Sequence, residues 1–264
     1  MKEVFKMWNS TKMVVLVALS AALYAAILIP FKGFVLIPGI TEVRPASALP
    51  IVLGLLFGPA GAWGSAIGNL IGDFFGTLGP GSIFGFVGNF FFAYVPYKLW
   101  ANLGIVKSDD AEPDLKSGRK ILAFIVCAIT GSAACGLIIA WGLELLGLVP
   151  FAALSAIITV NNSIPSIVLG IPLLLVLYPR IKKWDLLWSE ILPEEDMPPK
   201  GVKAKTGAAL MTVFTYGGLI AGLLAAMGVG QQIFTSNAGA AGSLGVIIVA
   251  GIGVVATILS SLLQ

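Results

Sequence analysis

Long apolar stretches alternate with short polar ones along the whole chain. Eight of these stretches approach the roughly 20 residues that a helix needs to cross the hydrocarbon core of a membrane. They are residues 13–30, 45–57, 59–75, 82–96, 121–149, 152–178, 206–229 and 243–263. Lipid offers no hydrogen-bond partners to the backbone, so we interpret these stretches as helices and not as open strands. The pattern predicts an all-α polytopic membrane protein with eight transmembrane helices.

The dipeptide Gly58-Pro59 decides the predicted topology. Proline lacks a backbone N–H and clashes with the preceding turn, so one helix should end before Pro59 and another begin there. The alternative is one kinked helix over 45–75. Because lysine and arginine in short loops stay cytoplasmic, the positions of these residues distinguish two helices from one kinked helix. Eight helices place fourteen of the sixteen Lys and Arg residues inside, whereas a fused helix would place thirteen outside. We therefore expect both termini to be cytoplasmic and the chain to lie in the cell membrane.

Composition agrees with this class. Hydrophobic residues make up 58% of the 264 and charged residues 11%, against roughly 25% charged residues in soluble domains. The chain has no histidine, only two cysteines, and no glycine-rich phosphate loop of the kind that binds ATP. Few side chains thus remain that would hold zinc or haem. We predict a protein that is not an enzyme and has no cofactor and no metal site.

Two hydrophilic loops, 101–120 and 180–205, lie on the predicted cytoplasmic side. The second loop separates six helices from a C-terminal pair. We predict a six-helix substrate-binding membrane domain over 1–183, a cytoplasmic linker over 184–205 and a transmembrane hairpin over 206–264. The loop after the first helix, 31–44, is apolar and rich in glycine and proline, which favours a folded lid over a solvated tether.

Polar side chains within the helices gather at one depth. At about 1.5 Å of rise per residue, the topology places them in the outer half, whereas 51–57 and 167–177 carry no strongly polar side chain. This distribution predicts an outward-opening cup with a dry floor. Ionisable groups within membrane helices are costly and indicate a functional site. The candidate substrate-binding residues are Glu42, Arg44, Asn69, Asp73, Asn89, Trp141, Glu144, Asn161 and Asn162.

A structural role competes with substrate binding at each of these positions. Glu42 and Arg44 could pair with each other, since surface ion pairs are common. Asp73 could cap its helix, and Glu144, closest to the outer surface, could be solvated. The asparagines could join neighbouring helices, at about 0.6 kcal/mol each. Four carboxamides at one depth nevertheless favour a site.

Small residues recur at every fourth position on two helices. Ala18, Ala22 and Ala26 form one row, and glycines at the same spacing form another over 64–76. Such rows let helix backbones approach closely. We expect the glycines to pack within the bundle, whereas the alanines fit either packing or the docking of a partner.

Three motifs in this order resemble the substrate-binding membrane subunit, or S-component, of energy-coupling factor (ECF) transporters for vitamins and related micronutrients. The stretch 17–26 (VALSAALYAA) is similar to the alanine-rich docking motif of that family. The stretch 55–61 (LLFGPAG), with 68–73 (GNLIGD), resembles the turn between its second and third helices. The stretch 161–165 (NNSIP) stands where such proteins often contact substrate. The resemblance covers about residues 13–183.

The resemblance implies a function. Such a subunit binds a small polar micronutrient in an outer cavity closed by the loop 31–44, and Ala18, Ala22 and Ala26 would dock on a coupling subunit that works with an ATPase pair. A queuosine precursor, a folate-like molecule and a corrinoid are candidate substrates. The usual member has six helices, so the C-terminal hairpin is a departure. It could pack on the bundle, mimic a partner helix or alter docking.

Two other function classes compete with substrate capture. A self-sufficient secondary transporter or facilitator would move its solute without partners, although we find no matching halves of the kind that such carriers usually have. A structural subunit of a membrane complex would bind no ligand. The net charge of +3 reflects the basic cytoplasmic loops, so we expect membrane lipid and no nucleic acid among the partners.

Overall fold

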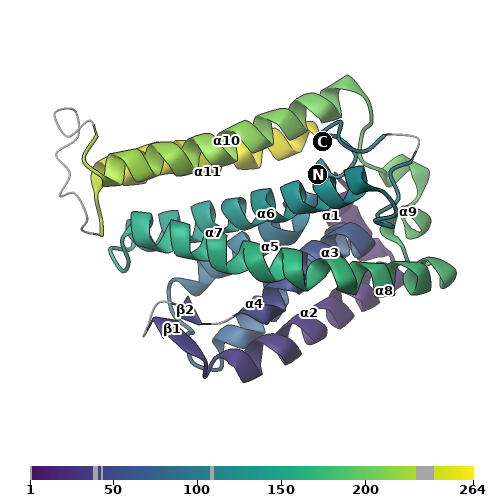
Figure 1. Ribbon diagram of the computed structural model, residues 1–264, viewed down its shortest axis with the longest axis horizontal. Coiled ribbons are helices and arrows are strands. Elements are labelled where there is room, and N and C mark those ends of the chain that lie inside the picture. Colours follow the sequence, from purple (N-terminus) through teal and green to yellow (C-terminus); the bar gives the residue numbers. More distant parts are fainter. Residues whose placement is uncertain (1, 38–40, 43, 108–109, 230–240) are drawn as a thin grey trace.

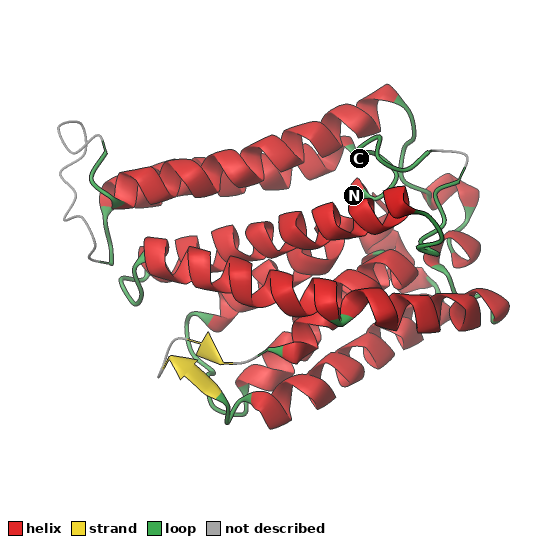
Figure 2. Ribbon diagram, viewed as in Figure 1, coloured by secondary structure: helices red, strands yellow, loops and turns green. Residues whose placement is uncertain are grey.

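The computed structural model describes residues 2–37, 41–42, 44–107, 110–229 and 241–264, without the side chains of 35–42. Within these ranges the helices pack into one bundle, with a small two-stranded ribbon at one end and both chain termini at the other (Figure 1). We call these the ribbon end and the terminal end. Figure 2 shows that loops join the helices at both ends of the bundle.

The elements follow each other in a simple order, with η denoting a short 3-10 helix. They are α1 (Lys2–Lys6), η1 (Met7–Asn9), α2 (Thr11–Phe31), β1 (Val35–Ile37), β2 (Thr41–Glu42), η2 (Pro45–Ser47), α3 (Ala48–Phe57), α4 (Pro59–Asp73), α5 (Ser82–Leu99), α6 (Gly118–Leu145), α7 (Phe151–Val168), α8 (Gly170–Lys183), α9 (Trp188–Ile191), η3 (Glu194–Asp196), α10 (Val202–Ala226), α11 (Leu244–Ser260) and η4 (Ser261–Leu263).

Five of the described helices are long and apolar enough to cross a membrane. They are α2, α6, α7, α10 and the run of α11 with η4. The run of η2 with α3 is a shorter apolar helix, and every residue of α3 is buried. The helical membrane class predicted from the apolar pattern is therefore confirmed. The antiparallel ribbon of β1 and β2, within the loop predicted to fold as a lid, is a departure from a purely helical chain.

Proline positions explain where the helices break. Gly58 separates α3 from α4 with a φ of 55°, a left-handed conformation that glycine adopts readily, so the predicted break before Pro59 is confirmed. The single helix predicted over 152–178 is wrong in detail, because it divides at Leu169 into α7 and α8. Pro172 has no N–H to donate to the carbonyl of Val168 four residues earlier.

A row of glycines joins α4 to α2. A Cβ at Gly64 would lie 2.3 Å from Cβ of Ser20, and one at Gly68 would lie 2.8 Å from the backbone oxygen of Ala21. Real Cβ atoms do not approach other atoms this closely, so only glycine permits this helix separation. The prediction that the glycine row packs within the bundle is confirmed for Gly64, Gly68 and Gly72 and wrong for Gly76, which is exposed with no described atom within 4 Å of an added Cβ.

The alanine rows of α2 divide between two faces. Ala21 and Ala25 are buried, whereas Ala18, Ala22 and Ala26 are exposed. The exposed row lies on the face of α2 turned away from α4.

The C-terminal hairpin of α10 and α11 packs against α6, on the side of the bundle opposite α2 (Figure 1). The two hairpin helices cross at glycines, since a Cβ at Gly253 would lie 2.4 Å from Cα of Gly218. The hydroxyl groups of Thr130 on α6 and Tyr216 on α10 form a hydrogen bond of 3.1 Å. The hairpin therefore packs on its own bundle, which was one of the three possibilities left open for it.

Segments from both ends of the chain meet at Lys98 on α5. Its Nζ lies 2.6 Å from Oε1 of Glu3 in α1 and donates to the backbone oxygen of Gln264 at 2.9 Å. The side chains of Lys98 and Glu3 are each 1% exposed. Lys2 and Lys6 both form ion pairs with Asp196 in η3. The terminal end is thus closed by contacts between α1, the loop after α8 and the last residues.

Candidate substrate-binding site

A row of polar side chains lies near the ribbon end. Arg44, just after the ribbon, donates from Nη2 to Oδ1 of Asn69 on α4 at 3.1 Å. Nδ2 of Asn69 donates to Oδ2 of Asp73 at 3.4 Å, because residues four positions apart share one helix face. Asn69 is 3% exposed and Asp73 is 8% exposed. The structure thus joins three of the residues predicted from the sequence in one row, in which Asn69 and Asp73 are buried and Arg44 is partly buried.

Helix α5 approaches this row through a glycine and adds a carboxamide. A Cβ at Gly85 would lie 3.1 Å from Nδ2 of Asn69 and 3.6 Å from Oδ2 of Asp73. One turn further, Asn89 donates from Nδ2 to the backbone oxygen of Gly85 and accepts a hydrogen bond from the hydroxyl of Tyr24 on α2, both at 2.8 Å. Asn89 therefore lies beside the row and connects α5 to α2.

Helices α6 and α7 contribute a second group of polar side chains. Asn162 on α7 accepts a hydrogen bond from Oγ of Ser47 at 2.9 Å, and its Nδ2 lies 3.7 Å from Sγ of Cys135 on α6. Oγ of Ser166, one turn later, donates to the backbone oxygen of Ser47 at 2.8 Å. The backbone N–H of Ser47 donates to the carbonyl oxygen of Arg44 at 2.9 Å. Arg44 thus lies between the two groups, which form one polar layer.

The polar layer is enclosed. Asn69, Asn89 and Asn162 are each 3% exposed or less, and each forms hydrogen bonds to neighbouring residues. An outward-opening cup was predicted, and it stays a prediction, because the loop expected to cover it lies partly outside the described residues. The predicted dry floor agrees with the structure, since the apolar residues of α3 over 51–57 are all buried.

Glu144 belongs to a different part of the molecule. Its Oε2 accepts the backbone N–H of Phe151 at 2.7 Å, and its Oε1 accepts that of Ser243 at 2.8 Å. A carboxylate is well placed at a helix start, where backbone N–H groups lack partners within the helix. Glu144 is 1% exposed, so solvation, the structural alternative for this residue, is wrong. Its contacts instead join the first residues of α7 and α11.

Trp141 also contacts the hairpin rather than the polar layer. Its Nε1 donates to the backbone oxygen of Ile247 at 2.9 Å, and its ring packs edge-on against Phe84 with the centroids 5.8 Å apart. A Cβ at Gly251 would lie 2.8 Å from Nε1. Its contacts therefore anchor α11 on α6.

Two further predicted residues have less direct placements. Asn161 is partly exposed beside the buried Asn162. The backbone of Glu42 lies in β2, paired with Val35, and its side chain lies outside the described part of the structure. The predicted pairing of Glu42 with Arg44 therefore stays a prediction.

Sequence reasoning missed several residues of the layer, including Tyr24, Ser47 and Cys135. Each has an ordinary packing role in a membrane helix, and only the neighbouring helix shows which polar partner it meets. Lys32 was missed as well. It is the C-cap of α2, and its Nζ lies 3.8 Å from Oδ1 of Asp73 and donates to Oγ1 of Thr77 at 2.5 Å. Its position at the first end of the lid loop 31–44 was the feature of the sequence that could have indicated a role in the site.

Comparison with known proteins identifies the family. A model of the QueT transporter family matches residues 14–179, which include the polar layer, α2 and the loop between them, and end before the hairpin. No curated protein and no solved structure matches the chain. The family consists of S-components of ECF-type transporters, which confirms the resemblance found in the sequence. The chain belongs to the QueT transporter family.

Proposed function

We propose that this protein captures a small polar micronutrient, of the queuosine-precursor class, in the polar layer near the ribbon end. The observation that carries the proposal is the row formed by the partly buried Arg44 and the buried Asn69 and Asp73 near the ribbon end. A guanidinium, a carboxamide and a carboxylate placed side by side within an apolar bundle offer donors and acceptors to a ligand and little to lipid.

Queuosine precursors are 7-deazaguanine bases, and their chemistry suits this set of side chains. The edge of such a base carries both N–H donors and a carbonyl acceptor, which carboxamides such as Asn69 and Asn162 can match. An aminomethyl substituent is a cation at neutral pH and would pair with a carboxylate such as Asp73. We expect the ligand to exchange hydrogen bonds with groups that now bond to one another.

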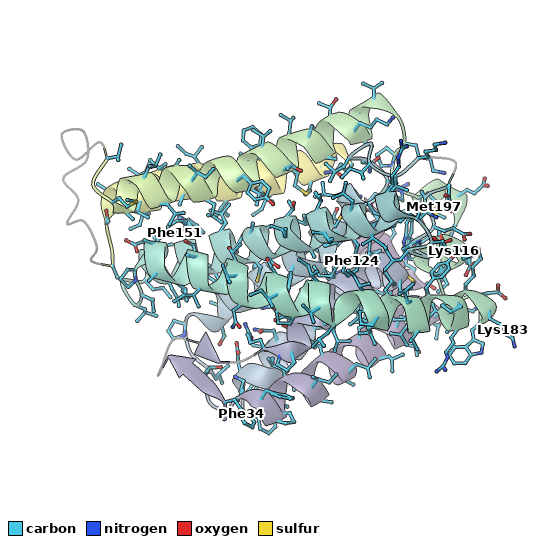
Figure 3. All side chains as sticks on the ribbon, viewed as in Figure 1. Phe34, Lys116, Phe124, Phe151, Lys183 and Met197 are labelled. Carbon is cyan, nitrogen blue, oxygen red and sulfur yellow. The ribbon has the colours of Figure 1, made fainter. Side chains whose placement is uncertain are left out.

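We infer that the ribbon end faces outward and the terminal end faces the cytoplasm, with eight crossings when α7 and α8 count as one. The distribution of lysine and arginine supports this orientation, because such residues in short loops stay inside. Lys116 and Lys183 lie at the terminal end (Figure 3), with Lys2 and Lys6 of α1. The loop 31–44 would then be the outer lid.

We propose that Ala18, Ala22 and Ala26 dock on a coupling subunit that works with an ATPase pair. Their exposure on α2 supports this role, since a row of small side chains lets another helix approach closely. The hairpin lies on the opposite side of the bundle and leaves this face uncovered. On this proposal, α10 and α11 form a permanent addition to the six-helix domain rather than a competitor for docking.

The proposal is tested by measuring whether 7-aminomethyl-7-deazaguanine binds to the purified full chain. Native mass spectrometry and titration calorimetry are the two measurements. We expect one molecule to bind without ATP. Asn69→Ala and Asn162→Ala should each raise Kd about tenfold or more, because a ligand that meets an unpaired buried polar group loses that much affinity. Asn102→Ala is the matched control, since that carboxamide bonds the backbone oxygen of Lys98 at the terminal end.

Each other outcome contradicts a named part of the proposal. Absence of both this ligand and any co-purified small molecule would contradict micronutrient capture. Unchanged affinity in both asparagine variants would place the site elsewhere. Accumulation of the base in liposomes by the chain alone would favour a self-sufficient transporter.

A further inference from the structure

The face of α4 at the ribbon end carries three polar residues at intervals of four. They are Asn69, Asp73 and Thr77, and the helical spacing continues past the last residue of α4 because the backbone N–H of Thr77 donates to the carbonyl of Asp73 at 3.0 Å. Each side chain bonds the next. Nδ2 of Asn69 donates to Oδ2 of Asp73 at 3.4 Å, and Oγ1 of Thr77 donates to Oδ1 of Asp73 at 3.1 Å.

A cation from each end of the lid loop contacts this face. Lys32 lies at the first end of the loop 31–44, and its ammonium contacts Asp73 and Thr77. Arg44 lies directly after the ribbon and donates to Asn69. The stem of Lys32 runs across Gly72, where a Cβ would lie 3.7 Å from its Cε. The two ends of the loop are therefore fastened to one face of one helix.

The order of these bonds fixes the orientation of the Asn69 carboxamide. A carboxamide has an accepting oxygen at one side and a donating nitrogen at the other. Asp73 accepts from the nitrogen, so the oxygen is turned toward Arg44. Lys32 holds the Asp73 carboxylate in place, and its side chain is 10% exposed against 12% for Asp73. Ion pairs this sheltered are less screened than surface pairs.

We propose that Lys32 is a positioning residue for the substrate site. Its ammonium fixes the Asp73 carboxylate, which orients the Asn69 carboxamide, and that carboxamide positions the Arg44 guanidinium. The same contacts of Lys32 keep the first end of the lid loop against α4. This inference rests on the proposed function insofar as Arg44 and Asn69 meet the substrate. The holding of the loop is independent of any ligand.

A spin-label distance tests the holding of the loop. Phe34 lies on the loop and is 63% exposed, and Leu78 lies beyond α4 and is 54% exposed. Both natural cysteines are buried. Spin labels on Phe34→Cys and Leu78→Cys in the full chain should therefore react selectively at these two positions. We expect one narrow distance distribution in the parent and in Lys12→Met, a control at the exposed start of α2. Lys32→Met should broaden it, and Lys32→Arg should restore most of the narrow population.

Affinity for 7-aminomethyl-7-deazaguanine tests the positioning. Lys32→Met should raise Kd about tenfold, since hydrogen bonds to charged groups are worth this much, and should raise the dissociation rate with it. Thr77→Val replaces the hydroxyl with a methyl group and is the second variant to test if Lys32→Met does not fold. It should raise Kd and the dissociation rate by smaller factors than Lys32→Met. Lys32→Arg should recover most of the affinity.

Two results would overturn the inference. One is a narrow distribution in Lys32→Met and Thr77→Val equal to that of the parent. The other is a loss of affinity that Lys32→Arg leaves uncorrected. If the parent protein binds no 7-deazaguanine base, the proposed function fails, and the label distances still decide whether Lys32 holds the loop.

Discussion

The hydroxyl of Tyr24 donates a hydrogen bond of 2.8 Å to the carboxamide oxygen of Asn89, and both side chains are 1% exposed. The bond connects α2, whose outer face carries the exposed alanine row, to the polar layer on α5. Removing the hydroxyl leaves a buried carboxamide oxygen without this donor. Such a loss costs about 1 to 3 kcal/mol.

Tyr24→Phe should therefore lower the free energy of unfolding by about 1 to 3 kcal/mol, as measured by thermal unfolding in detergent. Tyr97→Phe is the matched control, because the buried hydroxyl of Tyr97 has no hydrogen-bond partner among the described residues. Its removal should be neutral or stabilising. Equal destabilisation by the two variants would show that the bond to Asn89 contributes nothing specific.

Gly64→Ala should separate α2 from α4. The added Cβ would lie 2.3 Å from Cβ of Ser20, so the helices must move apart at a cost of about 1 to 3 kcal/mol. Gly79→Ala adds the same methyl group where no atom lies within 4 Å and should leave stability unchanged. The comparison uses the midpoint of thermal unfolding, and a stable Gly64→Ala variant would argue against the tight helix pair.

Glu144→Gln should weaken the attachment of the hairpin. Glutamine has one accepting oxygen instead of two, so one of the backbone N–H groups of Phe151 and Ser243 loses its partner. We expect a loss of about 1 to 3 kcal/mol in the free energy of unfolding, and faster proteolysis near the start of α11. The exposed Glu194→Gln is the control. Unchanged stability and proteolysis would contradict the role of Glu144 as the joint between α7 and α11.

Lys98→Met should be among the most destabilising single changes at the terminal end. It removes the ammonium group that lies 2.6 Å from the buried carboxylate of Glu3, and breaking a buried ion pair costs about 3 to 5 kcal/mol. Glu3→Leu combined with Lys98→Met removes both charges and should be much closer to the parent in thermal stability. If the double variant were as unstable as Lys98→Met alone, the unpaired charge would not be the cause of the destabilisation.

Acid should weaken the contact between α8 and the loop that joins α5 to α6. Hydrogen bonds from Lys182 and Tyr178 hold the pKa of Glu112 below its ordinary value of 4.5. A carboxyl with a lowered folded-state pKa stabilises the fold above 4.5, and this contribution disappears as the pH falls through the lower value. The contact is largely exposed, so the contribution is below about 1 kcal/mol.

The stability difference between the parent and Glu112→Gln should therefore be present at pH 7 and become smaller as the pH falls below 4.5. Thermal unfolding across this pH range measures it. A difference that stays constant across this range would contradict a charged role for Glu112.

The sequence alone determined the class of the protein and much of its layout. Apolar length predicted the helices, and Gly58-Pro59 predicted the break between α3 and α4, because backbone sterics there are local. Residue spacing placed Asn69 and Asp73 on one face at the depth of Asn89 and Asn162. The family resemblance also rested on local motifs, and it is confirmed by the match over residues 14–179.

Only the tertiary structure decided which polar side chains meet. A position along a helix gives its depth in the membrane, but the rotation and neighbours of that helix depend on packing across the bundle. Trp141 and Glu144 were predicted to lie at the depth of the site, but their hydrogen bonds go to the hairpin. Lys32, which looked like a loop residue, contacts Asp73 because the glycine row brings α2 against α4.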